Sequence, residues 1–332
     1  MSLLIGILIL VFIVGLCIGS FLNVVILRAL SGESIAFPAS KCPKCQNSLK
    51  WWHNIPVLSY IFLRGKCAFC KEHISIQYPI IELLTAIIFT FIFLKYGLRF
   101  DTLFMWAISA LLIVLAGTDI KEKVVFDVHA FSLIGVAILY AIFLTGMSLY
   151  QIHHTMPDYH LPKNVLLFNP VTNAILGAIV GGLVMEACAR IGYLIADTRA
   201  FGEGDTLIAA GLGALFGWYQ FLFVLLLSIL IQVLIFLPLF VKSLVTNKEW
   251  KTLIAFSAFV IYAAIFYGLQ NIISANIFFI IGAIVLAVIG VAVCVLILKG
   301  LRENPQNRTY LPFGPAMVIA SFFLMFLQML LV

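Results

Sequence analysis

The run Phe201-Gly202-Glu203-Gly204-Asp205 leads directly into a long apolar segment that begins at residue 205. A carboxylate that enters a membrane is costly unless it faces a protein interior or a water-filled cavity. A glycine-flanked acid also requires unusual backbone or a close approach between helices. Asp205 is therefore a candidate functional residue, although a turn followed by a helix N-cap would also favour Asp here. One carboxylate alone supports few reactions, so the question is whether a second acid can reach it.

The composition is that of a membrane protein. Of the 332 residues, 64% are hydrophobic and only 10% are charged, and the mean hydropathy is +1.16. A soluble domain has a far more even balance. Because the bilayer allows only helices or closed barrels, long apolar runs of this kind predict helices.

Ten apolar segments follow one another along the chain, and most reach the roughly 20 residues that cross about 30 Å of hydrocarbon. They are 3–27, 78–96, 101–118, 127–147, 171–195, 205–217, 219–241, 252–270, 274–298 and 312–332. The shortest is 205–217, which can cross the bilayer only if flanking residues extend it or if the helix is tilted little from the membrane normal. The expected fold class is an all-α polytopic membrane protein, a helical bundle of about 8–10 transmembrane helices.

The distribution of basic residues predicts the orientation. The first segment is expected to stay as a membrane span, because it lacks a basic n-region and Arg28 follows the apolar stretch. With the N-terminus outside, 17 of the 20 Lys and Arg residues fall on cytoplasmic connections, and only Lys95, Arg99 and Lys163 fall outside. The positive-inside rule favours this arrangement. The formal charge of +6 thus reflects orientation in a lipid bilayer, and nucleic acid is not an expected partner.

The alternation of spans supplies the second acid. Asp119 ends the third apolar segment and Asp205 begins the sixth, and both ends fall on the cytoplasmic side. A helix-end role for Asp119, beside Lys121 and Lys123, remains an alternative. Asp127 also competes, but its place across a short turn favours a turn or helix-start role.

Two apposed carboxylates suit hydrolysis by an activated water molecule. Like charges at close range share a proton, so one carboxylate can accept a proton from water while the other polarises a carbonyl. The sequence therefore predicts Asp119 and Asp205 as a catalytic pair, in a cleft that admits water, with Gly202 and Gly204 as active-site backbone.

The first cytoplasmic loop carries two Cys-x-x-Cys pairs, Cys42 with Cys45 and Cys67 with Cys70. Two such pairs can complete a tetrahedral thiolate site for Zn²⁺. Disulfides do not persist in the cytoplasm, and a redox pair would need no second copy. Structural zinc is thus the preferred interpretation. His53 and His73 are possible substitute ligands that four cysteines make unnecessary, and the other cysteines lie in apolar segments as packing residues.

Taken together, the motifs resemble the bacterial type IV prepilin peptidases, the bifunctional leader peptidase and N-methyltransferase family. The resemblance covers nearly the whole chain and rests on the cysteine loop and on five further stretches. These are Gly19-Ser20-Phe21-Leu22-Asn23-Val24-Val25-Ile26, Asn54-Ile55-Pro56-Val57-Leu58-Ser59, Tyr78-Pro79-Ile80-Ile81-Glu82, Gly202-Glu203-Gly204-Asp205 and Leu311-Pro312-Phe313-Gly314-Pro315.

The resemblance implies a concrete activity. Members of this family use two aspartates, here Asp119 and Asp205, to cut the leader from prepilin or pseudopilin precursors on the cytoplasmic face of the inner membrane. They then methylate the new N-terminal residue with S-adenosylmethionine. The residues that bind the methyl donor are not evident, and Glu82 is a weak candidate whose simpler interpretation is a helix-start charge.

The chain departs from the family pattern in several places. Phe126 stands where a proline is common, and Leu207 stands where a lysine is common. Residues 148–170 are expected to form a longer outside loop, whose His153, His154 and His160 could bind metal but are more simply solvated. Residues 246–300 are expected to add a helical hairpin.

The predicted organisation has five parts: a first transmembrane helix at 1–28, the tetracysteine loop at 29–77, which the resemblance associates with methyl transfer, the peptidase core at 78–245, the added hairpin at 246–300 and a C-terminal helix at 301–332. Three other functions remain open. A peptidase without methyltransferase activity is the nearest. A zinc-bearing membrane scaffold would not require both aspartates, and a transporter would place its acids near mid-bilayer in related halves.

Overall fold

In a computed structural model, the described residues are 2–37, 39–155, 169–196, 202–246 and 312–330, with scattered positions between 250 and 285. The elements are α1 (Ser2–Ser31), η1 (Trp51–Asn54), α2 (Leu58–Phe62), α3 (Gln77–Tyr96), α4 (Phe100–Glu122), α5 (Asp127–Thr155), α7 (Pro170–Ala196), α8 (Glu203–Thr246) and α11 (Gly314–Leu330). Apart from two isolated β-bridges in the cysteine loop, the regular structure of this part is helical. The predicted all-α class is confirmed.

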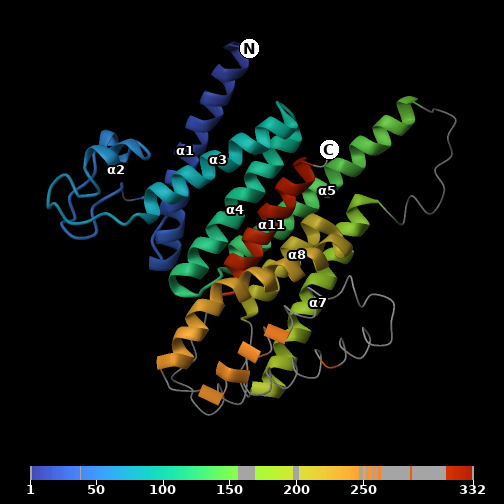
Figure 1. Cartoon of the computed structure of the whole chain (residues 1–332). Helices are drawn as coiled ribbons and strands as arrows, with labels where there is room; N and C mark the ends of the chain where they lie inside the picture. Colours follow the sequence, from blue (N-terminus) through green and yellow to red (C-terminus); the bar gives the residue numbers. More distant parts are fainter. Residues whose placement is uncertain are drawn as a thin grey trace. The chain divides into compact units, whose positions relative to one another are not determined.

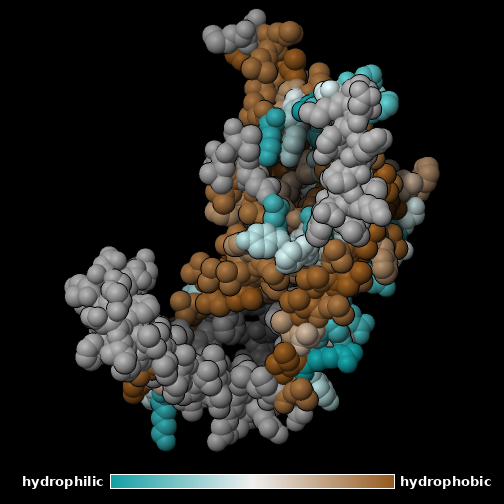
Figure 2. Space-filling view, turned by 90° about the vertical axis from the view of Figure 1, so that its right-hand side faces the viewer, coloured by the Kyte–Doolittle hydropathy of each residue, from teal (hydrophilic) through white to brown (hydrophobic). Residues whose placement is uncertain are grey.

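Six of the described helices are long and apolar enough to cross a membrane: α1, α3, α4, α5, α7 and α8. The shorter apolar helix α11 covers the last predicted segment. Apolar residues cover much of the helical surface on the face that Figure 2 presents. The predicted spans at 252–270 and 274–298 lie outside the described residues, apart from scattered positions.

The predicted segments 205–217 and 219–241 both fall within α8. The helix is interrupted at Gly217, whose φ of 77° and ψ of 168° are not helical. Such a conformation is readily adopted only by glycine. The break therefore lies at the boundary that the sequence predicts between the two segments.

The chain divides into two compact units. The first contains residues 1–185, 203–228 and 312–332, and the second contains residues 186–202 and 229–311. Within the first unit, α1 packs on α3 and α4, α3 packs on α4, and α4 also contacts α5 and α11 (Figure 1). Both predicted catalytic aspartates, Gly204 and the four cysteines belong to this unit, so its packing positions the candidate site, whereas Gly202 is the last residue of a segment of the second unit.

Small residues allow two pairs of helices, α1 with α3 and α7 with α8, to approach each other closely. A Cβ atom added at Gly15 of α1 would meet the backbone of Ala86 in α3, and one added at Gly177 of α7 would meet the backbone of Gly213 in α8. Helices in membranes associate through such close backbone contacts, because apolar side chains gain no hydrophobic free energy by moving from lipid into a helix–helix interface. The α7–α8 approach fixes the part of α8 that follows Asp205.

Candidate active site

The two predicted aspartates lie together. Asp119 occupies the last turn of α4 and Asp205 the first turn of α8, and their exposed fractions are only 5% and 6%. The two carboxyl groups are near enough to interact electrostatically. The sequence pairs these two residues because both lie at the same end of antiparallel spans. The structure places both in one buried site.

The turn between α4 and α5 explains how the two helix ends meet. Helix α4 is capped by the residue that follows it, Lys123, which adopts a left-handed conformation with φ of 56° and donates its backbone N–H to the Asp119 carbonyl at 2.9 Å. The turn then places Val125 against Gly204, where an added Cβ would collide with the valine side chain. A glycine directly before Asp205 is therefore required for α8 to start against this turn.

Helix α11 closes the site from a third direction. The backbone N–H of Gly314 hydrogen-bonds to the Asp119 carboxylate. A Cβ atom at position 314 would meet Oδ2 of Asp119 and would lie 3.1 Å from Cδ1 of Ile208. The sequence drew attention to the stretch around Gly314 but assigned it no role, because its contact with Asp119 is made only in three dimensions.

One oxygen atom of the Asp119 carboxylate remains available for a hydrogen bond. Its Oδ2 atom is buried and lacks a hydrogen-bond partner among the described residues. A buried polar atom without a partner is rare and calls for an explanation, such as a water molecule or a ligand. This oxygen can hold a water molecule at the carboxyl pair, which is what acid–base chemistry requires.

The competing acids are placed elsewhere. Asp127 is exposed at the start of α5, the position of a helix-start residue. Glu82 of α3 is 5% exposed, and its carboxylate accepts the backbone N–H of Val57 at 2.8 Å and a hydrogen bond from Ser20. Glu82 thus holds the tetracysteine loop against the helices. A direct role at a methyl-donor site would require it to give up these partners.

The other residues that the sequence analysis singled out lie outside the carboxyl pair. Phe126 lies in the α4–α5 turn, where its carbonyl accepts the backbone N–H groups of His129 and Ala130. Leu207 is half-buried on α8, two residues after Asp205. His153 and His154 are exposed at the end of α5, and His160 lies outside the described residues.

The four loop cysteines form one cluster. The sulfur atoms of Cys42, Cys45, Cys67 and Cys70 all lie within 4.8 Å of one another, and the Cys42–Cys70 pair is separated by 3.9 Å. In a tetrahedral thiolate site, a Zn–S distance of about 2.3 Å places the sulfur atoms about 3.8 Å apart. The residues present therefore fit a tetrahedrally coordinated metal ion.

Two matching turns build this cluster. In each, the first cysteine accepts a backbone N–H from the residue after the second cysteine, Gln46 in one turn and Lys71 in the other. Gln46 and Lys71 have φ values of 58° and 60°. An isolated β-bridge closes each turn, Lys41 with Ser48 and Lys66 with His73.

The two cysteines of the second turn differ in acidity. Backbone N–H groups of Cys70 and Phe69 lower the pKa of the Cys67 thiol to about 6. Against the effect of the Glu72 backbone N–H, burial and the neighbouring cysteine sulfurs raise the pKa of the Cys70 thiol to about 11. The thiolate is the form of cysteine that binds metal.

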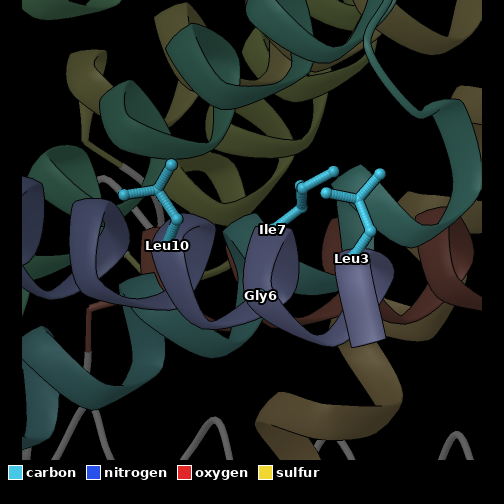
Figure 3. A pocket seen from close by; sticks show the side chains of 4 residues that line it. All are labelled: Leu3, Gly6, Ile7 and Leu10. Carbon is cyan, nitrogen blue, oxygen red and sulfur yellow. The ribbon is translucent and has the colours of Figure 1, made fainter. Parts of the chain in front are cut away.

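Two cavities lie away from the aspartates. One, of about 550 Å³, is lined by α5, by the start of α7 and by the Gly217 break of α8. The other is an open hollow of about 450 Å³ beside α1, and Figure 3 shows Leu3, Ile7 and Leu10 on the same side of that helix. Neither cavity is lined by an acidic or basic side chain, so neither replaces the carboxyl pair as the candidate site.

The comparisons with known proteins agree with this geometry. Residues 13–96 match the family model of the bacterial peptidase A24 N-terminal domain, and residues 106–237 match that of the type IV leader peptidase family. The first match contains the four cysteines, and the second contains both aspartates.

Several curated proteins are similar to this chain, and each is named prepilin leader peptidase/N-methyltransferase. The protein of Myxococcus xanthus is 33% identical over 65% of this chain and 58% of its own length. That of Neisseria gonorrhoeae is 32% identical over 62% of this chain and 72% of its own length, and that of Klebsiella pneumoniae is 30% identical over 62% and 84%. The chain thus spans somewhat over half the length of the first relative and more of the others.

No solved structure matches the chain. The matched models, the similar proteins and the placement of Asp119, Asp205 and the four cysteines inside the matched regions agree with one another. The chain belongs to the type IV leader peptidase family.

Proposed function

We propose that the chain is a membrane aspartyl endopeptidase that cleaves the leader from type IV prepilin or pseudopilin precursors. The observation that carries this proposal is the meeting of Asp119 and Asp205 in a buried site, with an unpartnered carboxylate oxygen on Asp119. The names of the similar proteins support the choice of substrate. The partners are then the precursor's leader, its hydrophobic helix and the lipid bilayer.

The carboxyl pair acts as general base and general acid in turn. One proton is shared by the pair, and the ionised aspartate accepts a proton from water as the water oxygen attacks the scissile carbonyl. The protonated aspartate hydrogen-bonds to that carbonyl and stabilises its developing negative charge. When the tetrahedral intermediate collapses, the C–N bond breaks and the leaving nitrogen takes a proton from the pair. Gly314 holds the Asp119 carboxylate in place during these transfers.

The second proposed activity is N-methylation of the new N-terminal residue. S-adenosylmethionine supplies the methyl group when it is bound, and the names of the similar proteins support this activity. Among the described residues, Glu82 is occupied by Val57 and Ser20, so no donor site is assigned to it. A peptidase that lacks methyltransferase activity is the alternative that a labelled methyl donor would reveal.

The tetracysteine cluster is proposed to hold structural Zn²⁺. Four thiolates on two matching turns suit a closed tetrahedral site, which contributes to folding and leaves no position for a substrate. The similar proteins and the membrane-length helices support a location in the bacterial inner membrane with several spans. The charge distribution predicts the orientation, with the N-terminus outside and the aspartates facing the cytoplasm. The predicted division at residues 28, 77, 245 and 300 remains part of this proposal.

The test is a cleavage assay with the purified full chain and a prepilin peptide that carries its leader. Asp119→Asn and Asp205→Asn keep the size of each side chain and remove its acid–base chemistry. Each is expected to lower cleavage by at least about 1,000-fold, because both members of the pair are needed in every turnover. Full cleavage by either variant would overturn the pair. Absence of cleavage by the wild-type chain would favour a zinc-bearing scaffold or a transporter.

A further inference from the structure

The cytoplasmic loop exposes large apolar side chains that its metal cluster does not need. On α2, Leu58, Ile61 and Phe62 are 51%, 62% and 81% exposed. Their spacing of three and four residues places them on one side of the helix. On η1, which contacts α2, Trp51 and Trp52 are 76% and 45% exposed. These five side chains are called the η1–α2 face.

Contacts with the helices fix the depth of this face. Gly19 of α1 lies against Glu82 of α3, whereas Ile26 of α1 lies against Gly117, two residues before Asp119. Seven residues of α-helix separate the two levels by about 10 Å. The Glu82 level is therefore about 10 Å farther into the span than the level near the aspartates.

The loop is bonded at that deeper level. The backbone N–H of Val57, directly before α2, donates to Oε2 of Glu82 at 2.8 Å. Val57 has φ of 61°, an outlier for a β-branched residue, which the surrounding contacts must impose. In the view of Figure 1, α2 is accordingly drawn at the height of the middle of α1, not beyond its C-terminal end. The η1–α2 face is thus held at a depth where the outer surface of the helices meets lipid.

The charges of the loop fit the headgroup region. Between residues 29 and 77 there are six Lys and Arg residues and two Glu residues. The ammonium of Lys50 lies 5.0 Å from the centre of the Trp52 ring, and Arg64 is exposed two residues after Phe62. Aromatic rings with basic residues beside them are typical of membrane–water interfaces, and basic clusters attract anionic lipids.

We propose that the η1–α2 face is a lipid-binding surface, whose apolar side chains enter the boundary between headgroups and acyl chains while the neighbouring basic residues contact anionic headgroups. This surface would anchor the tetracysteine loop to the bilayer in addition to the two helices that flank it. A group of large exposed apolar side chains on a loop marks an interaction site. The depth set by Glu82 selects lipid as the occupant.

The test uses the full chain in nanodiscs. Subtracting the fluorescence of the Trp51→Phe/Trp52→Phe variant from that of the wild type isolates the signal of Trp51 and Trp52. In phosphatidylcholine brominated near the headgroup end of its chains, we expect this difference signal to fall at least twofold. We expect aqueous iodide to quench it little, and replacing half of the lipid by phosphatidylglycerol to deepen the quenching by bromine.

A variant pair separates the apolar face from the rest of the loop. Ile61→Ser/Phe62→Ser should weaken bromine quenching and increase iodide quenching. Phe37→Ser changes an equally exposed phenylalanine, at 78%, outside the η1–α2 face and should leave both unchanged. Metal content, measured on each variant, verifies that the cysteine cluster is intact.

Two outcomes would overturn the proposal. Quenching by iodide without quenching by brominated lipid would mean that the face lies in water. Protection from both quenchers would mean that protein covers it, either this chain or a second copy. Neither readout depends on peptidase activity, so failure here is distinct from failure of the proposed function.

Discussion

Gly314 touches a proposed catalytic carboxylate although it lies in the C-terminal helix, remote in sequence from both aspartates. An added methyl group at this position would meet Oδ2 of Asp119. We expect Gly314→Ala to lower prepilin cleavage by about 100-fold, because a misplacement of about 1 Å in a reacting group has effects of that size. Cleavage rates of the purified variant, at saturating substrate, measure this loss.

The matched control is Gly135→Ala in α5. A Cβ atom added at Gly135 meets nothing within 4 Å, so the same change is expected to leave cleavage unchanged. Equal rates for Gly314→Ala and the wild type would show that the contact with Asp119 has no part in the reaction.

The cysteine cluster gives a second prediction at this scale. Cys45→Ser removes one of four ligands, and we expect bound zinc to fall from about one ion per chain to less than half. Elemental analysis after dialysis against a mild chelator measures the loss. Cys17→Ser changes a cysteine of α1 outside the cluster and should retain the ion. Zinc retained in full by Cys45→Ser would contradict a four-thiolate site.

The sequence predicts the position of some site residues but not of others. Spacing alone grouped the four cysteines, and alternation of spans put Asp119 and Asp205 at one end of the bundle. Both arguments depend on local pattern and chain order. The contact of Gly314 with Asp119 and the bond from Val57 to Glu82 depend on how separate helices pack, which no local pattern records.

Among the elements, the crossing of α7 and α8 holds the helix that begins with Asp205. Gly177 faces the backbone of Gly213, and Gly181 faces that of Ala209. Overpacking a close contact costs about 1–3 kcal/mol. We therefore expect Gly177→Leu to lower the thermal unfolding midpoint by several degrees and to reduce cleavage. Thermal unfolding in detergent and the cleavage assay are the measurements.

Gly182→Ala is the control on the same helix. Its added Cβ would lie 3.8 Å from the Ala210 side chain, an ordinary van der Waals contact. An unfolding midpoint for Gly177→Leu as high as that of Gly182→Ala would contradict the close α7–α8 crossing.

Helix α8 illustrates what apolar periodicity can and cannot predict. Length and hydropathy predicted two segments with a boundary near residue 218, and the break lies at Gly217. The same pattern could not indicate that the two segments join without a loop. That junction depends on a glycine conformation and on the Asn173 side chain of α7, which lies directly against Gly217.

For the whole molecule, the charge distribution predicts orientation. The ends of α4 and α5 fall on opposite sides of the bilayer if each spans it once. We expect alkaline phosphatase fused after Thr155 to be active and the same enzyme fused after Lys123 to be inactive, because phosphatase folds only outside the cytoplasm. Green fluorescent protein at the two positions should give the opposite pattern. The reverse result at both positions would place the aspartates outside and exclude cytoplasmic cleavage.

The two proposed activities should be separable within one chain. Asp119, Asp205 and Gly314 come from α4, α8 and α11, whereas the tetracysteine loop joins α1 and α3 and is bonded to α3 through Glu82. The family resemblance associates the tetracysteine loop with methyl transfer, and this loop shares no residue with the carboxyl pair. We therefore expect Asp205→Asn to abolish leader cleavage yet to methylate a peptide that already lacks its leader at a rate within about twofold of wild type. Transfer of a labelled methyl group to that peptide measures this activity. Loss of both activities in Asp205→Asn, with its unfolding midpoint unchanged, would mean that methyl transfer also uses the carboxyl pair.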